Sequence, residues 1–161
     1  MQEKENILDF FQEVLAEGSE EEKQIIALTK HAIEYMRKRN TAYLSGFLGL
    51  ESEYLEDGSY RFQVPITPFM LNGLKIVHGG ISATLADVTM GSLARRVTGK
   101  KVVTVEMNVH YLAPGKGKTL ISTSRLLRKG KQLCVCECLI TNEKGDKVLS
   151  ASGTFFILQN H

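Results

Sequence analysis

A run of small and apolar residues follows the sequence His78-Gly79-Gly80 and contains a single charged residue, Asp87. From Gly79 to Ala94 the other side chains are apolar, small or hydroxylic, which is typical of a helix buried around most of its circumference. The paired glycines allow a sharp turn into this helix, whose first N–H groups have no acceptor within it. The segment therefore predicts a central hydrophobic helix that begins with free backbone donors.

Asp87 is the candidate for chemistry in this helix. Burying an isolated carboxylate costs several kcal/mol, so an acid at this position either serves a reaction or bonds to a neighbouring backbone group. The free N–H groups at the helix start are suited to hold an oxygen that gains negative charge. The sequence leaves both alternatives for Asp87 open.

Composition excludes several classes of protein. The chain has 161 residues, of which 43% are hydrophobic, so it can bury one substantial core. Its formal net charge of +2 and the lack of a Lys/Arg-rich arm do not favour nucleic acid as a partner. No apolar run approaches the roughly 18 residues that cross a bilayer, and the charged N-terminus does not resemble a signal peptide. We expect a cytoplasmic protein without a membrane partner.

Three cysteines, Cys134, Cys136 and Cys138, alternate along one segment. In a strand this spacing places all three thiols on one face, roughly 6.5–7 Å apart. Thiolates at that spacing do not converge on a tetrahedral zinc, and adjacent pairs are poorly placed for a disulfide. The pattern predicts small buried hydrophobic residues, and we expect no metal site.

Two helices are predicted before the central segment. Apolar residues recur at spacings of three and four from residue 6 to 17, as in an amphipathic helix. Ser19 and Glu22 then match a capping box for a second helix, which should end near Arg39. Residues 1–40 are therefore predicted to form an N-terminal helical extension whose apolar positions pack on the domain or on another subunit.

Strand patterns dominate the domain predicted for residues 41–161. The expected strands are Tyr43–Glu53 and Ser59–Val64 before the central helix, and Val102–Leu112, Lys118–Arg128, Gln132–Asn142 and Lys147–Leu158 after it. One hydrophobic helix among six strands favours an antiparallel β-sheet wrapped around that helix over a βαβ array. The predicted fold class is α+β.

The residues around the central helix resemble a known family. The string Asn72-x5-His78-Gly79-Gly80-x6-Asp87, followed by the sequence TVEMNVHYLAP at residues 104–114, is similar to the hot-dog-fold thioesterases of the PaaI-like group, close to the 4-hydroxybenzoyl-CoA thioesterases. The resemblance covers roughly residues 41–158. It implies the hot-dog fold and hydrolysis of an acyl- or aryl-acyl-CoA thioester to the free acid and CoA, by a homodimer or a dimer of dimers.

The resemblance also implies roles for individual residues. Asp87 would be the nucleophile or the general base, and the Gly79 N–H would polarise the thioester carbonyl. Asn72, His78 and Thr104 would support them. Each of these three also has a structural alternative: an Asx-type turn for the asparagine, a bond to the backbone for the histidine and strand propensity for the threonine.

The spacing of Gly79 and Asp87 adds a constraint. They are eight residues apart, or about 12 Å along one helix, whereas an attacked carbonyl must lie roughly 3 Å from both donor and nucleophile. One helix cannot supply both groups. Two helices that run antiparallel across a two-fold axis can, so we expect an inactive monomer and two equivalent sites per dimer.

Other residues are expected to bind the substrate. Gly80 lies at the helix start, and the apolar loop before it is expected to line an acyl pocket with Phe69, Met70, Leu74 and Ile76. The CoA phosphates should meet basic residues in hairpin turns, with Lys116, Arg128 and Lys131 as candidates beside Lys118, Arg125 and Lys129. Such charges are usually only solvated. No cofactor is expected apart from CoA as part of the substrate.

Two other functions stay open. A non-catalytic acyl-CoA sensor would bind the same ligand without turnover, although the acidic N-terminal helices would make a poor DNA-binding effector. A hot-dog dehydratase or hydratase would need a histidine paired with an acid, which the His-Gly-Gly sequence does not resemble. The preferred acyl group and the choice between dimer and tetramer do not follow from the sequence.

Overall fold

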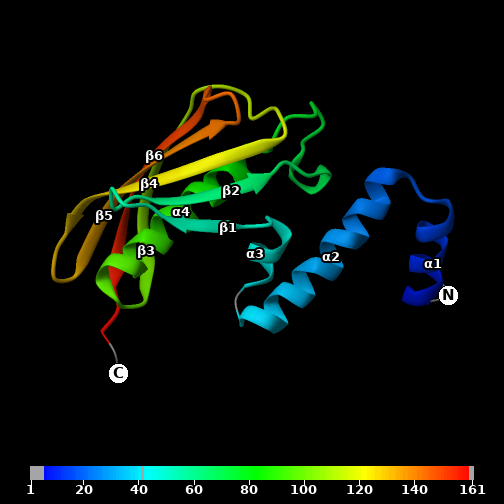
Figure 1. Ribbon diagram of the computed structural model, residues 1–161, viewed down its shortest axis with the longest axis horizontal. Helices are drawn as coiled ribbons and strands as arrows, with labels where there is room; N and C mark the ends of the chain where they lie inside the picture. The colour runs from blue at the N-terminus through cyan, green and yellow to red at the C-terminus, as the bar shows by residue number, and fades with distance from the viewer. Residues whose placement is uncertain (1–5, 41, 160–161) are drawn as a thin grey trace. The chain divides into compact units, whose positions relative to one another are not determined.

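The computed structural model describes residues 6–40 and 42–159, and the chain divides into two compact units, Met1–Gly49 and Leu50–His161 (Figure 1). In the described part, no helix is both long and apolar enough to span a membrane. The domain boundary predicted between residues 40 and 41 stays a prediction.

The first unit is helical. It contains α1 (Ile7–Glu17), α2 (Glu20–Arg39) and the short α3 (Tyr43–Phe47). The predicted capping box at the start of α2 is confirmed: the Ser19 N–H donates to the Glu22 carboxylate at 2.7 Å, and the Glu22 N–H donates to the Ser19 hydroxyl at 3.3 Å.

The strand predicted for Tyr43–Glu53 is wrong. Its first half is α3, and only Glu51–Tyr54 is extended, as β1. A Cβ atom on Gly46 would lie 2.5 Å from the Ala32 Cα, so the glycine lets α3 pack tightly on α2. Contact with another helix therefore overrides the local strand pattern.

The second unit is a single antiparallel sheet with one long helix. Its elements are β1, β2 (Tyr60–Pro65), the short 3-10 helix η1 (Pro68–Met70), α4 (Gly79–Thr98), β3 (Val102–Tyr111), β4 (Thr119–Lys129), β5 (Leu133–Asn142) and β6 (Lys147–Ile157). The strands lie in the order β1-β2-β4-β5-β6-β3, and α4 packs against five of them, from β2 to β6 (Figure 1). The predicted α+β class, with an antiparallel sheet around a central helix, is confirmed.

The core lies between α4 and the sheet. Leu85, Met90 and Leu93 of the helix are buried, as are Leu149 and Phe155 of β6, one of the strands that α4 contacts. Burying each large apolar side chain contributes about 1.5–3 kcal/mol, so this face holds α4 firmly on the sheet. The charged side chains of α4 lie outside this buried face.

A buried chain of hydrogen bonds also links α4 to the sheet. The Thr89 hydroxyl lies 2.6 Å from the Leu85 carbonyl and 2.7 Å from the Ser122 hydroxyl on β4. Ser122 lies 3.2 Å from the Cys138 sulfur on β5. Since Thr89 donates its only proton to Leu85, Ser122 donates to Thr89 and the Cys138 thiol donates to Ser122. This series of hydrogen bonds therefore requires Cys138 in its protonated form.

All three cysteines are buried, as predicted. Burial raises the pKa of each thiol, and that of Cys138 reaches about 11. A protonated thiol is a poor nucleophile and a poor metal ligand. The cysteines are therefore part of the core.

This burial predicts slow thiol chemistry. At pH 8, iodoacetamide should label the folded protein at least roughly 100-fold more slowly than the chain unfolded in urea, because the folded thiols are both protonated and covered. Mass spectrometry of the intact chain measures the rates, and the urea sample, which should take up three labels, is the control. Rapid labelling of the folded protein would contradict this account of the core.

Candidate active site

The loop Leu71–Val77 brings the chain to the start of α4. A β-bridge between Leu71 and Val77 closes it. The Asn72 side-chain oxygen accepts from the Leu74 N–H at 2.9 Å and the Ile76 N–H at 3.4 Å, so it is used within the loop. These bonds support the structural alternative for Asn72, an Asx-type turn that shapes the entry to the helix.

His78 caps the first turn of α4. Its Nδ1 accepts from the Gly80 N–H at 3.1 Å, and its carbonyl accepts from the Ile81 N–H at 2.9 Å and the Ser82 N–H at 3.1 Å. A backbone N–H can only donate, so Nδ1 carries no proton in this arrangement and Nε2 carries the proton of the neutral ring. The exposed His78 side chain thus fixes the turn and offers an N–H donor at its other nitrogen.

The Gly79 N–H is the free donor of this turn. Within residues 6–40 and 42–159, it donates to no acceptor. It lies at the positive end of a helix that runs from Gly79 to Thr98. The first turn of α4 therefore presents one backbone donor, beside the His78 side chain, to an incoming carbonyl oxygen.

Asp87 lies two turns further along α4 and is half-buried. Its Oδ1 accepts a hydrogen bond from the Thr104 hydroxyl on β3, at 2.8 Å. The partner is a side chain from a neighbouring strand and not a nearby backbone group. This bond orients the carboxylate. Among the described residues, none donates a hydrogen bond to the other carboxylate oxygen, Oδ2. The structure therefore brings together two predicted site residues, Asp87 and Thr104.

An irregularity in β3 determines which side chains face α4. The register with β6 shifts between Thr104 and Glu106, so Val105 is an extra residue in the strand. Thr104 pairs with Phe155, and Tyr111 pairs with Leu149 six residues away, so Thr104 and Tyr111 lie on the same face of the sheet. In a regular strand their spacing of seven would put them on opposite faces.

Tyr111 is a residue that the sequence analysis did not assign to the site. Its hydroxyl donates to the Gly79 carbonyl at 3.1 Å. The sequence offered one signal, because Tyr111 ends the strand that carries Thr104. Without the bulge at Val105, however, strand alternation would put the Tyr111 side chain on the face opposite to that of Thr104.

The residues expected to line an acyl pocket have different environments. Leu74 is 79% exposed at the loop tip and Phe69 is also exposed, whereas Ile76 is half-buried and Met70 is fully buried. The Met70 carbonyl accepts from the His78 N–H at 2.8 Å. Met70 thus anchors the loop from within, and the exposed apolar surface comes from Phe69 and Leu74.

The basic candidates for CoA separate into two groups. Lys116 follows Gly115, whose carbonyl accepts from the Val77 N–H at 2.9 Å, so it lies near the start of α4. Arg128 and Lys131 line a surface cavity of about 550 Å³ at the β4–β5 hairpin. Next to them, the Lys129 ammonium donates to the Val97 carbonyl near the C-terminal end of α4. The chain does not bring Lys116 together with the other two.

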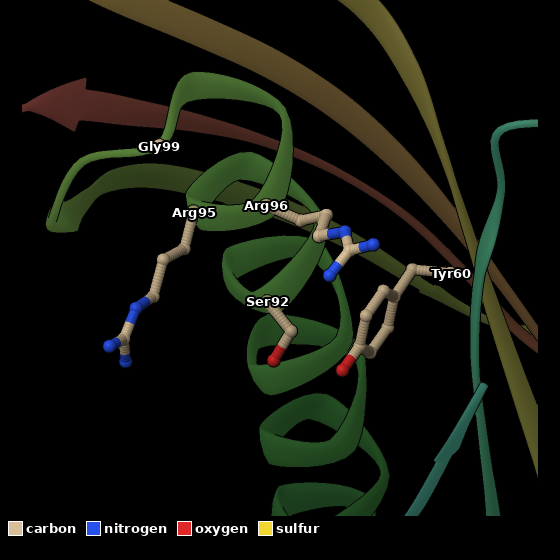
Figure 2. A pocket seen from close by; sticks show the side chains of 5 residues that line it. All are labelled: Tyr60, Ser92, Arg95, Arg96 and Gly99. Carbon is tan, nitrogen blue, oxygen red and sulfur yellow. The ribbon is translucent and has the colours of Figure 1, made fainter. Parts of the chain in front are cut away.

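A second hollow, of about 460 Å³, lies at the C-terminal end of α4 (Figure 2). Arg96 and Ser92 lie beside Tyr60 of β2, whereas Arg95 points away from them. The Arg96 guanidinium carbon is 4.9 Å from the centre of the Tyr54 ring. The described residues that line the hollow include neither a carboxylate nor an imidazole, so it lacks a general base. The Asp87 region is therefore the better candidate for catalysis.

Comparison with known proteins identifies relatives of this chain. A model of the thioesterase superfamily matches residues 74–149, the part that contains His78, Asp87 and Thr104. A medium/long-chain acyl-CoA thioesterase of Salmonella typhimurium, YigI, is 30% identical over 127 residues, which cover 68% of this chain and 82% of that protein. A Halobacterium salinarum protein that carries an esterase name is 37% identical over 101 residues, covering 58% of this chain and 66% of that protein.

Solved structures support the same relationship. The crystal structure of the BH2602 protein from Bacillus halodurans with CoA superposes with a TM-score of 0.83 and 35% identity, covering 91% of this chain and 99% of that chain. The chain therefore belongs to the thioesterase superfamily, and its antiparallel sheet around a central helix is the hot-dog fold.

Proposed function

We propose that this protein hydrolyses acyl-CoA thioesters to the free acid and CoA, at a site shared by two copies of the chain. The observation that carries the proposal is the carboxylate of Asp87 on α4, the helix that begins with the free Gly79 N–H. The Thr104 hydroxyl on β3 holds this carboxylate. The relatives support the substrate class, since one is named as an acyl-CoA thioesterase and the structure of another was determined with CoA.

In the proposed mechanism, the thioester carbonyl oxygen accepts from the Gly79 N–H, with the His78 Nε2–H as a second donor. These donors stabilise the negative charge that forms on the oxygen as the carbonyl is attacked. Asp87 either removes a proton from the attacking water or attacks the carbonyl carbon itself to form a mixed anhydride. The C–S bond breaks in both routes and the CoA thiolate leaves; in the second, water then hydrolyses the anhydride.

A second copy of the chain is needed because Gly79 and Asp87 are on one rigid helix. Their separation of eight residues is about 12 Å along the axis, too far for one carbonyl to meet both. In the proposed dimer, the donor of one copy and the carboxylate of the other face the same substrate. A two-fold axis then generates two identical sites.

Strand β3 is the proposed contact between the copies. In the described chain it pairs only with β6, so its other edge has free N–H and C=O groups. Val103 and Val105 on this strand are 47% and 60% exposed, and such an edge is suited to pair with another strand. In antiparallel pairing of two β3 strands, the two α4 helices run in opposite directions, as the shared site requires.

Substitution of the acid tests the role of Asp87. Asp87→Asn keeps the shape and can still accept from Thr104, but it cannot act as base or nucleophile, so kcat should fall by about 10²- to 10⁴-fold with little change in KM. Thiol release from a panel of acyl-CoAs measures both constants. Asp9→Asn, the same change on exposed α1, is the matched control and should keep full activity.

The same assay separates the alternative functions. A sensor would bind acyl-CoA and release no thiol, and a hydratase would alter the acyl chain while CoA stays attached. Full activity in Asp87→Asn would refute the proposed role of this carboxylate even if the protein proves to be a thioesterase.

A pair of substitutions at Gly79 tests the backbone donor. Proline fits the first position of a helix, and the His78 ψ of 133° suits a residue before proline, so Gly79→Pro removes the N–H while the helix start is kept. Its Cβ meets the Tyr111 ring, so the reference must be a variant that carries the same Cβ. Gly79→Ala adds a similar Cβ but keeps the N–H. We expect kcat to be roughly 10²- to 10³-fold lower in the proline variant than in the alanine variant. Equal rates would exclude this N–H as the donor.

Mixing two inactive variants tests whether the site is shared. A heterodimer of Asp87→Asn with Gly79→Pro contains one intact donor facing one intact carboxylate, so co-expression at equal levels should restore about a quarter of wild-type activity. Two differently tagged chains, purified in sequence, give the heterodimer for direct assay. If the site lies within one chain, the mixture stays inactive.

A further inference from the structure

We propose that Tyr111 is a positioning residue that aims the Gly79 N–H at the substrate. This inference rests on the proposed function, because it assigns the means by which the donor of that site is oriented. Tyr111 itself need not touch the reacting atoms.

The tyrosine contacts Gly79 in two ways. Its hydroxyl donates to the Gly79 carbonyl at 3.1 Å. Its ring packs on the glycine, because a Cβ built on Gly79 would lie 3.2 Å from Tyr111 Cε1 and 3.4 Å from Cζ. Tyr111 is nevertheless 60% exposed in the single chain, so it contributes little to the core of that chain.

The peptide unit between Gly79 and Gly80 is held at both ends. Tyr111 bonds to its carbonyl oxygen, and His78 Nδ1 accepts from its N–H at 3.1 Å. The preceding peptide unit is held through the His78 carbonyl, which accepts from two N–H groups of the next turn. The Gly79 N–H lies in the plane of this preceding unit, which is joined at the Gly79 Cα to the unit that Tyr111 and His78 hold.

This restraint matters because a glycine backbone does not by itself hold one conformation. Glycine adopts a wider range of backbone angles than any other residue, and the first turn of a helix lacks the full set of internal hydrogen bonds. A donor stabilises developing charge best when it is already oriented before the reaction. The Tyr111 hydrogen bond supplies that orientation from outside the helix.

The ring has a second effect on the same donor. It covers one side of the Gly79 Cα, and we expect it to exclude water from that side of the glycine. A hydrogen bond to a charged oxygen is stronger where water is excluded. Loss of the hydroxyl alone should therefore cost less than loss of the hydroxyl and the ring together.

Two variants separate these effects. In Tyr111→Phe, which keeps the ring, we expect kcat to fall roughly 3- to 10-fold with KM within about twofold of wild type. In Tyr111→Leu, which removes both contacts, kcat should fall at least another roughly threefold. Tyr54→Phe is the matched control, because it removes the hydroxyl of another partly exposed tyrosine, 45% exposed on β1, and should keep wild-type kcat.

A readout without substrate tests the geometry directly. Hydrogen exchange of the Gly80 N–H, measured by NMR, should be about 3- to 10-fold faster in Tyr111→Phe, because the restrained peptide unit loses one of its two bonds. The Leu93 amide, in the C-terminal half of α4, should exchange at the wild-type rate in both proteins. This pattern distinguishes a local change at the helix start from general destabilisation.

Two results for Tyr111→Phe would overturn the role proposed for Tyr111. Wild-type kcat in Tyr111→Phe excludes a role in catalysis, and unchanged Gly80 exchange excludes the restraint itself. If the wild-type protein releases no thiol from any acyl-CoA, the proposed function fails instead, and the exchange measurement still decides whether Tyr111 holds the turn.

Discussion

The rigid central helix is the constraint on which the rest of this structure depends. One face of α4 is buried against the sheet, and the buried bonds from Leu85 through Thr89 and Ser122 to Cys138 fix its position there. The donor at Gly79 and the carboxylate of Asp87 are held apart at a distance set by the helix, which one chain cannot change without breaking α4.

The same rigidity favours a shared site, because the groups of each copy are already in position. In the proposed dimer, each chain would supply one donor and one acid on a preformed scaffold, and a two-fold axis would bring the complementary halves together. The side chains around each half are restrained by partners from other elements. Thr104 on β3 orients the acid, while Tyr111 on the same strand bonds to the start of the helix. One edge strand therefore supports both halves of the proposed chemistry.

Local signals in the sequence were sufficient for much of the fold. The capping box at Ser19, the start of α4 at Gly79 and five of the six strands depend on neighbouring residues, and the structure agrees with them. The exception, the predicted strand from Tyr43 to Glu53, failed because Gly46 packs on Ala32 far away in the sequence. A periodicity within ten residues contains no information about such a contact.

A lone acid follows a helix start at a spacing too long for one carbonyl to reach both, and this can be read from the sequence because helix geometry is a local property. The partners that hold these groups come from distant segments and are visible only in the folded chain. The bulge at Val105 reverses the alternation of β3, so that Thr104 and Tyr111 both face α4. A bulge arises from the pairing of two strands, β3 and β6, that are distant in sequence, and so no local pattern in either of them predicts it.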